Sequence, residues 1–251
     1  MQIDLNADLG EGCGNDEAIL EYVSSINVAC AWHAGSADEM LSLVRAARLR
    51  GVAIGAHPSF PDRENFGRRE MILPLPSVRA GVLYQVGALE GILRAEGGEL
   101  SHVKPHGAMY NQAARDPELA HCIARAIRDF NPELAVMGLA GSQFIAALRA
   151  EGVSAIEEGF ADRRYTADGR LTNRNLPGAL IEDKADVLAQ VLSLVKNGTA
   201  IAVDGSTCRV RVETICLHGD GPQALDYARA IRAMLRSEGV EVGPGRGNKN
   251  L

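Results

Sequence analysis

Four of the six histidines stand beside glycine or proline in short, turn-like segments. They are His33 in WHAG, His57 in GAHP, His106 in KPHG and His218 in LHGD. An imidazole held at a tight turn can donate or accept a proton, stabilise an oxyanion or bind a metal ion. A single loop histidine is usually only a hydrogen-bonded side chain. The repetition of the pattern is what predicts a site.

Carboxylates accompany these histidines. Asp8 and Glu11 lie in the segment NADLGEG, which begins at Asn6, and Asp220 closes LHGD. A carboxylate beside imidazoles can activate water, hold a metal ion or accept backbone amides of its turn. The residue types do not separate a hydrolytic general base from a metal site. The candidate metal ligands are Asp8, His33 and His57.

Cationic side chains occur in two places where a core element or a long loop is expected. Lys104 ends an apolar segment and precedes Pro105. It could bind an anionic substrate or form an ion pair inside the fold. Within FADRRYTADGRLTNR, Arg163 belongs to a run of arginines that can bind carboxylate or phosphoryl oxygens by paired hydrogen bonds. The run comprises Arg163, Arg164, Arg170 and Arg174.

The elements that position these groups alternate along the chain. Short β-branched segments predict seven strands, and amphipathic stretches such as 78–93 and 187–195 predict helices between them. This alternation requires parallel strands, which occur in a closed barrel or an open doubly wound sheet. The predicted strands are 2–6, 26–30, 52–56, 100–104, 134–139, 153–157 and 212–217.

Polar groups follow nearly every predicted strand, and this favours the barrel. A closed barrel brings the carboxyl ends of its strands to one mouth, whereas an open sheet spreads them along a line. We therefore expect an α/β fold, a TIM-like seven-stranded parallel (β/α) barrel forming a single domain over residues 1–251. The polar segment 160–183 is expected to be an active-site loop.

Composition excludes several classes of function. The chain carries 26 Lys and Arg against 32 Asp and Glu, so its net charge of −6 disfavours nucleic acid as a partner. No apolar run is long enough to span a membrane, and the acidic N-terminus is unlike a signal peptide, so a cytoplasmic location is expected. No phosphate-binding P-loop is present, because GPGRGNKN at 243–250 lacks the final Ser or Thr.

Six longer motifs carry a family resemblance. Together they resemble the LamB/YcsF family of 5-oxoprolinase A subunits, in the expected order through almost the whole chain. The motifs are DLNADLGEG (4–12), NVACAWHAGS (27–36), GAHPSFPDRENFGRR (55–69), HVKPHGAMYN (102–111), EGFADRRYTADGRLTNR (158–174) and CLHGD (216–220).

The resemblance implies a seven-stranded barrel related to carbohydrate deacetylases. It also implies a reaction, the ATP-dependent cleavage of 5-oxo-L-proline to L-glutamate with release of ADP and phosphate. Two further subunits, B and C, are implied as partners. The alternatives are a metal-dependent deacetylase or amidase acting alone, which would need a divalent metal ion, and a non-catalytic subunit that only binds the lactam.

For the implied reaction, we expect Asp8 or a neighbouring histidine to activate water. Lys104 with Arg163 would hold a carboxylate or phosphate, and the histidines would move protons or stabilise an oxyanion. The candidate catalytic residues are Asp8, His57, His106, His218 and Asp220. The candidate substrate-binding residues are Asn6, Glu11, His33, Lys104 and Arg163.

The chain departs from the family pattern at one place. The usual CGFHAGDP is replaced by CAWHAGSA at 30–37. Trp32 is expected to keep an aromatic wall, and Ser36 can still cap the following helix. Because Ala31 replaces the usual glycine, we expect the mouth of the barrel to be narrower and the preferred lactam to differ.

Overall fold

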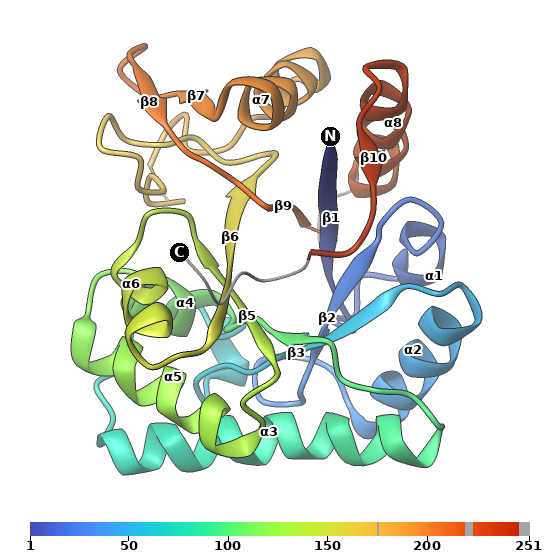
Figure 1. Cartoon of the computed structure of the whole chain (residues 1–251), viewed down its shortest axis with the longest axis vertical. Coiled ribbons are helices and arrows are strands. Elements are labelled where there is room, and N and C mark those ends of the chain that lie inside the picture. Colours follow the sequence, from blue (N-terminus) through green and yellow to red (C-terminus); the bar gives the residue numbers. More distant parts are fainter. Residues whose placement is uncertain (175, 219–222, 246–251) are drawn as a thin grey trace.

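A computed structural model of the chain describes residues 1–174, 176–218 and 223–245 (Figure 1). Seven parallel strands form a closed barrel, since the last strand pairs with both its predecessor and the first strand. The closing register aligns Asp8 with His218. The barrel strands are β1 (Gln2–Leu9), β2 (Ser25–Ala29), β3 (Ala53–His57), β4 (His102–Val103), β5 (Ala135–Leu139), β6 (Ser154–Phe160) and β9 (Thr214–His218).

All seven predicted strands, and the closed barrel, are confirmed. Several strand boundaries differ, most of all those of the first, fourth and sixth strands, the last of which continues to Phe160 instead of ending at residue 157. The first strand continues to Leu9 because Asn6 and Asp8 remain in the hydrogen-bonded ladder with β2. The fourth strand is reduced to His102 and Val103. The polar residues Asn6 and Asp8 therefore belong to the barrel wall rather than to the loop after it.

Helices cover the outside of the barrel, and α3 runs along the lower edge of Figure 1. Their ends follow ordinary capping chemistry. The backbone amide of Glu39 donates to Ser36 Oγ, Asp116 accepts two amides at the start of α5, and Gly198 ends α7 with a positive φ. The helices are α1 (Asp16–Ile19), α2 (Ala37–Leu49), η1 (Arg63–Asn65), α3 (Leu75–Ala95), α4 (Gly107–Ala113), α5 (Pro117–Phe130), α6 (Gln143–Ala150), α7 (Lys184–Asn197) and α8 (Ala224–Ser237).

Three short strands lie outside the seven-strand prediction. Strands β7 (Thr199–Ile201) and β8 (Thr207–Arg209) form an antiparallel hairpin, and β10 (Glu241–Val242) pairs with the start of β1. In Figure 1 the hairpin lies beside α7 at the opposite end of the molecule from α3. Among the described helices, none combines the length and apolarity that crossing a bilayer requires.

A buried glutamine fixes the long segment after β6. Gln190 of α7 donates its amide to the carbonyl oxygens of Phe160, Ala161 and Arg163, at 2.8, 3.2 and 2.8 Å respectively. The amide of Phe160 in turn donates to the hydroxyl of buried Tyr165. This loop therefore begins from a rigid point, which sets the position of Arg163 at the mouth of the barrel.

Candidate active site

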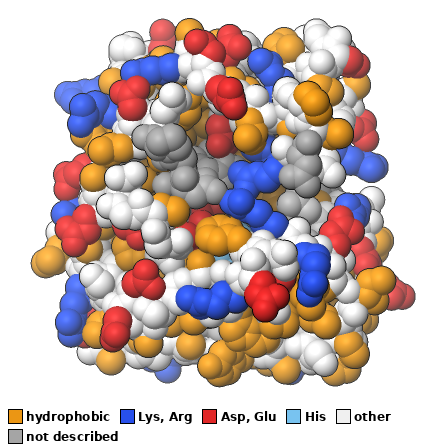
Figure 2. All heavy atoms as spheres, turned by 180° about the vertical axis from the view of Figure 1, so that it is seen from behind, with side chains coloured by type: hydrophobic (Ala, Val, Ile, Leu, Met, Phe, Trp, Pro, Cys, Tyr) orange, Lys and Arg blue, Asp and Glu red, His pale blue; other side chains and the backbone are white. Residues whose placement is uncertain are grey.

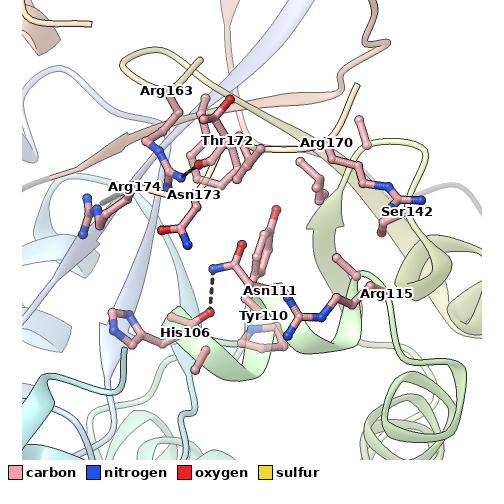
Figure 3. A pocket seen from close by; sticks show the side chains of 18 of the residues that line it. His106, Tyr110, Asn111, Arg115, Ser142, Arg163, Arg170, Thr172, Asn173 and Arg174 are labelled. Carbon is pink, nitrogen blue, oxygen red and sulfur yellow. Dashed lines mark hydrogen bonds between the residues drawn. The ribbon is translucent and has the colours of Figure 1, made fainter. Parts of the chain in front are cut away.

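A polar cavity of about 740 Å³ opens at the carboxyl ends of the strands. The segment 168–174 lines it, together with groups from β1, β3, the loop after β4 and the start of α6 (Figure 3). Figure 2 shows a face on which Lys and Arg side chains gather around a central hollow. The carboxyl rim therefore brings several of the predicted site residues together in one cavity. Its charged and imidazole-bearing lining residues include Asp8, Glu11, His57, Lys104, His106 and Arg163.

Lys104 occupies the inner end of the cavity, and its ammonium is already paired. Its Nζ lies 2.9 Å from Asp8 Oδ1 and 2.8 Å from Glu158 Oε1, and it donates to Asn6 Oδ1 at 3.3 Å. Burial alone would lower the pKa of Lys104. The carboxylates of Asp8 and Glu158 outweigh burial and raise that pKa well above its usual value. Lys104 is therefore a fixed cation that holds Asp8 in place.

The side-chain amide of Asn27 holds the same oxygen of Asp8 as Lys104 does. Asn27 donates to Asp8 Oδ1 and to Asn6 Oδ1, both at 2.8 Å, and its own oxygen lies 2.8 Å from His102 Nε2. Burial lowers the pKa of His102 to about 3, so this imidazole is neutral and donates to Asn27. His102 therefore has a structural role, as its place within a strand predicts.

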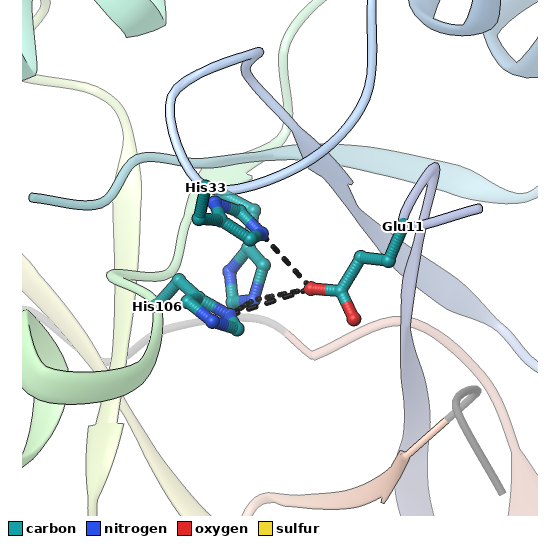
Figure 4. Close-up of side chains that lie close together, drawn as sticks. Glu11, His33 and His106 are labelled. Atoms are coloured by element: carbon teal, nitrogen blue, oxygen red, sulfur yellow. Dashed lines mark hydrogen bonds and ion pairs between the residues drawn. The ribbon is translucent and has the colours of Figure 1, made fainter. Parts of the chain in front are cut away.

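Next to Asp8, three histidines and a carboxylate converge. Glu11 Oε1 lies 3.0 Å from His33 Nε2, 3.4 Å from His106 Nδ1 and 3.9 Å from His57 Nε2 (Figure 4). His33 and His106 stack with their ring centroids 3.7 Å apart. Asp8 Oδ2 lies 3.4 Å from His57 Nε2, which joins this group to the Lys104 pair.

Backbone carbonyls orient two of the imidazoles. His57 Nδ1 lies 2.7 Å from the oxygen of Lys104, and His106 Nε2 lies 2.9 Å from the oxygen of Phe66. Phe66 has a φ of 56°, and a Cβ on the following Gly67 would lie 2.8 Å from the His106 ring. Glycine is therefore required at 67 for the loop to approach the histidines closely.

Burial strongly disfavours charge on two of these rings. Burial, reinforced by nearby His57, lowers the pKa of His33 to about 2. Burial together with the neighbouring His33 and His57 lowers the pKa of His106 well below its usual value. Both imidazoles are neutral at pH 7, which is the form that accepts a proton or binds a metal ion.

The thiols at the two strand ends are not nucleophiles. Burial raises the pKa of the Cys30 thiol to about 12 and that of Cys216 well above its usual value. Cys216 Sγ nevertheless lies 3.1 Å from Lys104 Nζ, so it forms part of the polar wall. A thiol at this pKa is protonated and unreactive.

Arg163 projects from the loop after β6 into the cavity (Figure 3). Its Nη2 donates to the carbonyl of Thr172 at 2.7 Å. Within the described part of the chain, the buried Arg163 Nε and Thr172 Oγ1 have no hydrogen-bond partner. Burial lowers the pKa of Arg163, although a guanidinium stays charged in proteins. Unsatisfied buried polar groups are rare in folded proteins, so these two atoms at the cavity wall require an explanation, such as a catalytic role or a bound ion or water.

Further arginines line the outer cavity, and two of them form ion pairs. Arg115 pairs with Glu70 at 2.6 Å, and Arg170 pairs with Asp168 at 3.1 Å. Ser142, directly before α6, lines the same cavity (Figure 3). The outer cavity is therefore more cationic than the chain as a whole, whose net charge is −6. Its arginines are Arg68, Arg115, Arg170, Arg174 and Arg209.

Of the predicted site residues, Asn6 and His33 do not line this cavity, and two others lie wholly or partly outside the described structure. The backbone of His218 ends β9 opposite Asp8, but its side chain lies outside the described part of the structure. Asp220 lies outside the described residues altogether, as does most of the glycine-rich tail at 243–250.

The consequences expected from CAWHAGSA differ from the structure in two respects. Trp32 packs outward, 6.0 Å from Tyr84 and against Gly81 of α3, instead of forming a cavity wall. Ala31 does not line the cavity either, so it does not narrow the mouth. Its effect is on the backbone, where a φ of 66° explains why glycine is usual at this position. Ser36 caps its helix as expected.

Sequence reasoning missed several residues of the site. Glu158 pairs with Lys104, and its second oxygen has no hydrogen-bond partner among the described residues. The buried Tyr110 hydroxyl interacts with Glu158, and burial together with this carboxylate raises the pKa of Tyr110 well above its usual value. The signal for Glu158 was a carboxylate inside the apolar strand 154–160. Nothing in the sequence distinguished Tyr110, because a tyrosine at a helical spacing usually belongs to the core.

The donor set beside Asp8 could hold a metal ion. Ligand atoms of Glu11, His33, His57 and His106 all lie within 4.8 Å of one another. Three imidazoles and a carboxylate suit a zinc-class ion, for which nitrogen and carboxylate ligands are usual. The sequence-predicted ligands His33 and His57 belong to this cluster. Asp8 lies beside it and is paired with Lys104.

This protein is a parallel (β/α) barrel that carries acidic, imidazole and guanidinium side chains at the carboxyl ends of its strands. That is where (β/α)-barrel enzymes have their active sites. A sequence profile of the LamB/YcsF family matches residues 3–250, and the chain belongs to that family. It is similar to the crystal structure of a lactam utilization protein from Thermus thermophilus. The two share 45% identity over 97% of this chain and 99% of that one, with a TM-score of 0.91.

A more distant likeness concerns the fold alone. The structure of T48 deacetylase with substrate covers 98% of this chain and 94% of its own, at 12% identity and a TM-score of 0.52. The barrel is thus shared with a deacetylase, as the resemblance implies.

Proposed function

We propose that this chain is the A subunit of an ATP-hydrolysing 5-oxoprolinase, which cleaves 5-oxo-L-proline to L-glutamate and acts with subunits B and C. The observation that carries the proposal is the 45% identity, over nearly the whole chain, to a protein described as a lactam utilization protein. The cavity supports it, because a carboxylate, neutral imidazoles and a buried guanidinium are the groups that hydrolysis of an anionic amide requires.

The chemistry explains the need for ATP. A five-membered lactam is a stable amide whose carbonyl carbon is a poor electrophile. Transfer of the γ-phosphoryl group to the amide oxygen releases ADP and activates that carbon. Water then adds to it, the ring C–N bond breaks as nitrogen takes up a proton, and a glutamyl phosphate forms. A second water molecule releases phosphate and leaves glutamate.

This chain supplies the hydrolytic half of the reaction. Asp8 accepts the proton of the attacking water, since Lys104 fixes one of its oxygens and the other lies 3.4 Å from His57. His106, which lines the same cavity, moves protons or stabilises the tetrahedral oxyanion. His218 and Asp220 keep their proposed proton-transfer roles, which rest on the sequence alone.

Arg163 binds the substrate carboxylate in this scheme. Its Nε and the Thr172 hydroxyl are buried in the cavity wall without partners among the described residues, so a carboxylate would satisfy both. Asn6, Glu11, His33 and Lys104 were expected to touch substrate. Glu11 and Lys104 line the cavity, which supports this role for them. Asn6 and His33 do not line it, and they hold neighbouring site residues in place instead.

Glutamate release from 5-oxoproline tests the proposal. The chain is assayed alone and together with candidate B and C subunits, each with and without ATP. We expect glutamate only when ATP and both partners are present. Glutamate without ATP, or no glutamate from any combination, would overturn the proposal.

A second candidate is a metal-dependent amidase or deacetylase that acts alone. The observation that favours it is the cluster of Glu11 with three histidines beside Asp8. A bound zinc-class ion would lower the pKa of a water molecule and polarise an amide carbonyl. Hydrolysis of a small amide or acetylated sugar by the isolated chain, without ATP and abolished by a chelator, would identify this function.

A further inference from the structure

We propose that Glu11, His33, His57 and His106 bind one divalent metal ion of the zinc class. The inference does not rest on the lactam or on ATP, because it follows from which ring nitrogens carry hydrogen. It also differs from the ligand set expected from sequence, with Glu11 and His106 joining His33 and His57 in place of Asp8.

Hydrogen bonds to the backbone determine the tautomers of two histidines. A carbonyl oxygen can only accept, so His57 carries its proton on Nδ1, facing Lys104, and His106 carries its proton on Nε2, facing Phe66. The ring nitrogens without hydrogen are therefore His57 Nε2 and His106 Nδ1, and we call them the bare nitrogens. These two atoms lie 2.9 Å apart. Two bare nitrogens at this distance repel each other unless a proton or a metal ion lies beside both.

More acceptors converge on the same point. Glu11 Oε1 lies 3.4 Å from the bare nitrogen of His106 and 3.9 Å from that of His57. His33 Nε2 is 3.0 Å from the same carboxylate oxygen. In the structure Glu11 Oε1 accepts from His33 Nε2, while His33 Nδ1 has no hydrogen-bond partner among the described residues and can carry the ring proton when Nε2 binds a metal ion. His33 can therefore present a bare Nε2 to a metal ion.

The type of metal follows from the donors. Imidazole nitrogen with a single carboxylate suits zinc-class ions, whereas calcium and magnesium prefer sites made of oxygen. The carbonyl bonds of His57 and His106 are the outer contacts that usually orient metal-bound histidines. Glu11, His57 and His106 also line the cavity, so a bound ion would be accessible to a small ligand.

Metal binding is measured on the full chain after chelator treatment and dialysis. Zn²⁺ is titrated by calorimetry, and Co²⁺ is followed by its visible absorption. We expect one equivalent of each, a rise in the unfolding temperature on adding Zn²⁺, and Co²⁺ bands typical of nitrogen and oxygen ligands. His57→Ala and His106→Ala should each weaken binding about 100-fold or more, since even outer contacts contribute up to that much.

Two further variants keep the test independent of folding. Glu11→Gln preserves the shape of the side chain and should weaken binding with an unchanged circular dichroism spectrum. His121→Ala is the matched control, because His121 lies on α5 and contacts Glu151 outside the cavity. Absence of saturable binding by the wild-type chain would overturn the proposal, and would indicate that His57 and His106 share a proton instead. Equal affinity in His121→Ala and His106→Ala would overturn it too.

Discussion

Lys104 and Glu158 form an ion pair of 2.8 Å inside the barrel, with both side chains almost completely buried. The same ammonium lies 2.9 Å from Asp8, so one cation serves two carboxylates. Lys104→Met would leave both carboxylates without their cation. Breaking a buried pair in this way costs roughly 3–5 kcal/mol. We expect a loss of this size in the free energy of unfolding, measured by urea denaturation.

A double-mutant cycle tests whether the pair causes this loss. Adding Glu158→Gln to Lys104→Met removes one of the stranded carboxylates while preserving shape. We expect the double variant to be more stable than the single Lys104→Met variant by at least about 1 kcal/mol. Strictly additive effects of the two substitutions would show that Lys104 stabilises the barrel by some other contact.

Arg163 provides a test of substrate binding. Arg163→Met removes a charge-assisted contact worth about 1.5–3 kcal/mol, so KM should rise roughly 10–100-fold with a smaller change in kcat. Arg164→Met is the matched control, because Arg164 pairs with Asp186 and does not line the cavity. Steady-state kinetics of glutamate release by the assembled complex measure both constants. An unchanged KM in Arg163→Met would remove this residue from substrate binding.

Ala31 stores backbone strain that glycine would relieve. Its φ of 66° lies in the left-handed region, which costs a side chain with a Cβ roughly 1 kcal/mol. Ala31→Gly should raise the free energy of unfolding by about 0.5–1 kcal/mol, measured by urea denaturation. Ala34→Gly, at a buried neighbour that lacks a positive φ, should instead lower it. Destabilisation by both substitutions would refute the strain.

His102 should make the protein less stable in acid. Its pKa is lowered to about 3 in the folded chain, whereas the unfolded chain protonates this group near 6.5. Between these values the unfolded state binds more protons, so stability falls as pH drops from about 6.5 towards 3. One such group contributes at most about 1.4 kcal/mol per pH unit.

His102→Gln isolates this contribution. Glutamine can still donate to Asn27 but does not titrate, so the decline in unfolding free energy below about pH 6.5 should become shallower. The comparison uses urea denaturation of both proteins at several pH values between about 4 and 7.5. Parallel curves for the two proteins would mean that His102 is not the titrating group.

Much of the fold could be predicted from sequence because it depends on local patterns. Alternating apolar strands and amphipathic helices, with caps at Ser36 and Asp116, indicate a parallel α/β fold. The hairpin β7–β8 was missed because its three-residue strands carry too short a pattern. The extension of β1 to Leu9 was missed because buried polar pairing across strands does not register as apolar alternation.

The site was predictable only in part. Turn histidines such as His57 and His106 were detectable by their glycine and proline neighbours. The roles of Lys104 and Glu158 depend on pairing between β6 and the loop after β4, which are more than fifty residues apart. Ring tautomers depend on which carbonyl each histidine meets, such as that of Phe66. Tertiary structure sets these contacts, so the sequence can show a charged residue within or after an apolar strand but not the partner that it meets.

The most direct test of the account is the rate of glutamate release from 5-oxoproline by the ATP-supplied complex containing Asp8→Asn. Asparagine keeps the size of this side chain and one oxygen that can accept from Lys104 and Asn27, but it cannot accept a proton from water. The account predicts at least a roughly hundredfold lower turnover, on the scale of a lost general base, with an unchanged circular dichroism spectrum. A rate close to that of the wild-type complex would contradict the assignment of hydrolysis to this barrel.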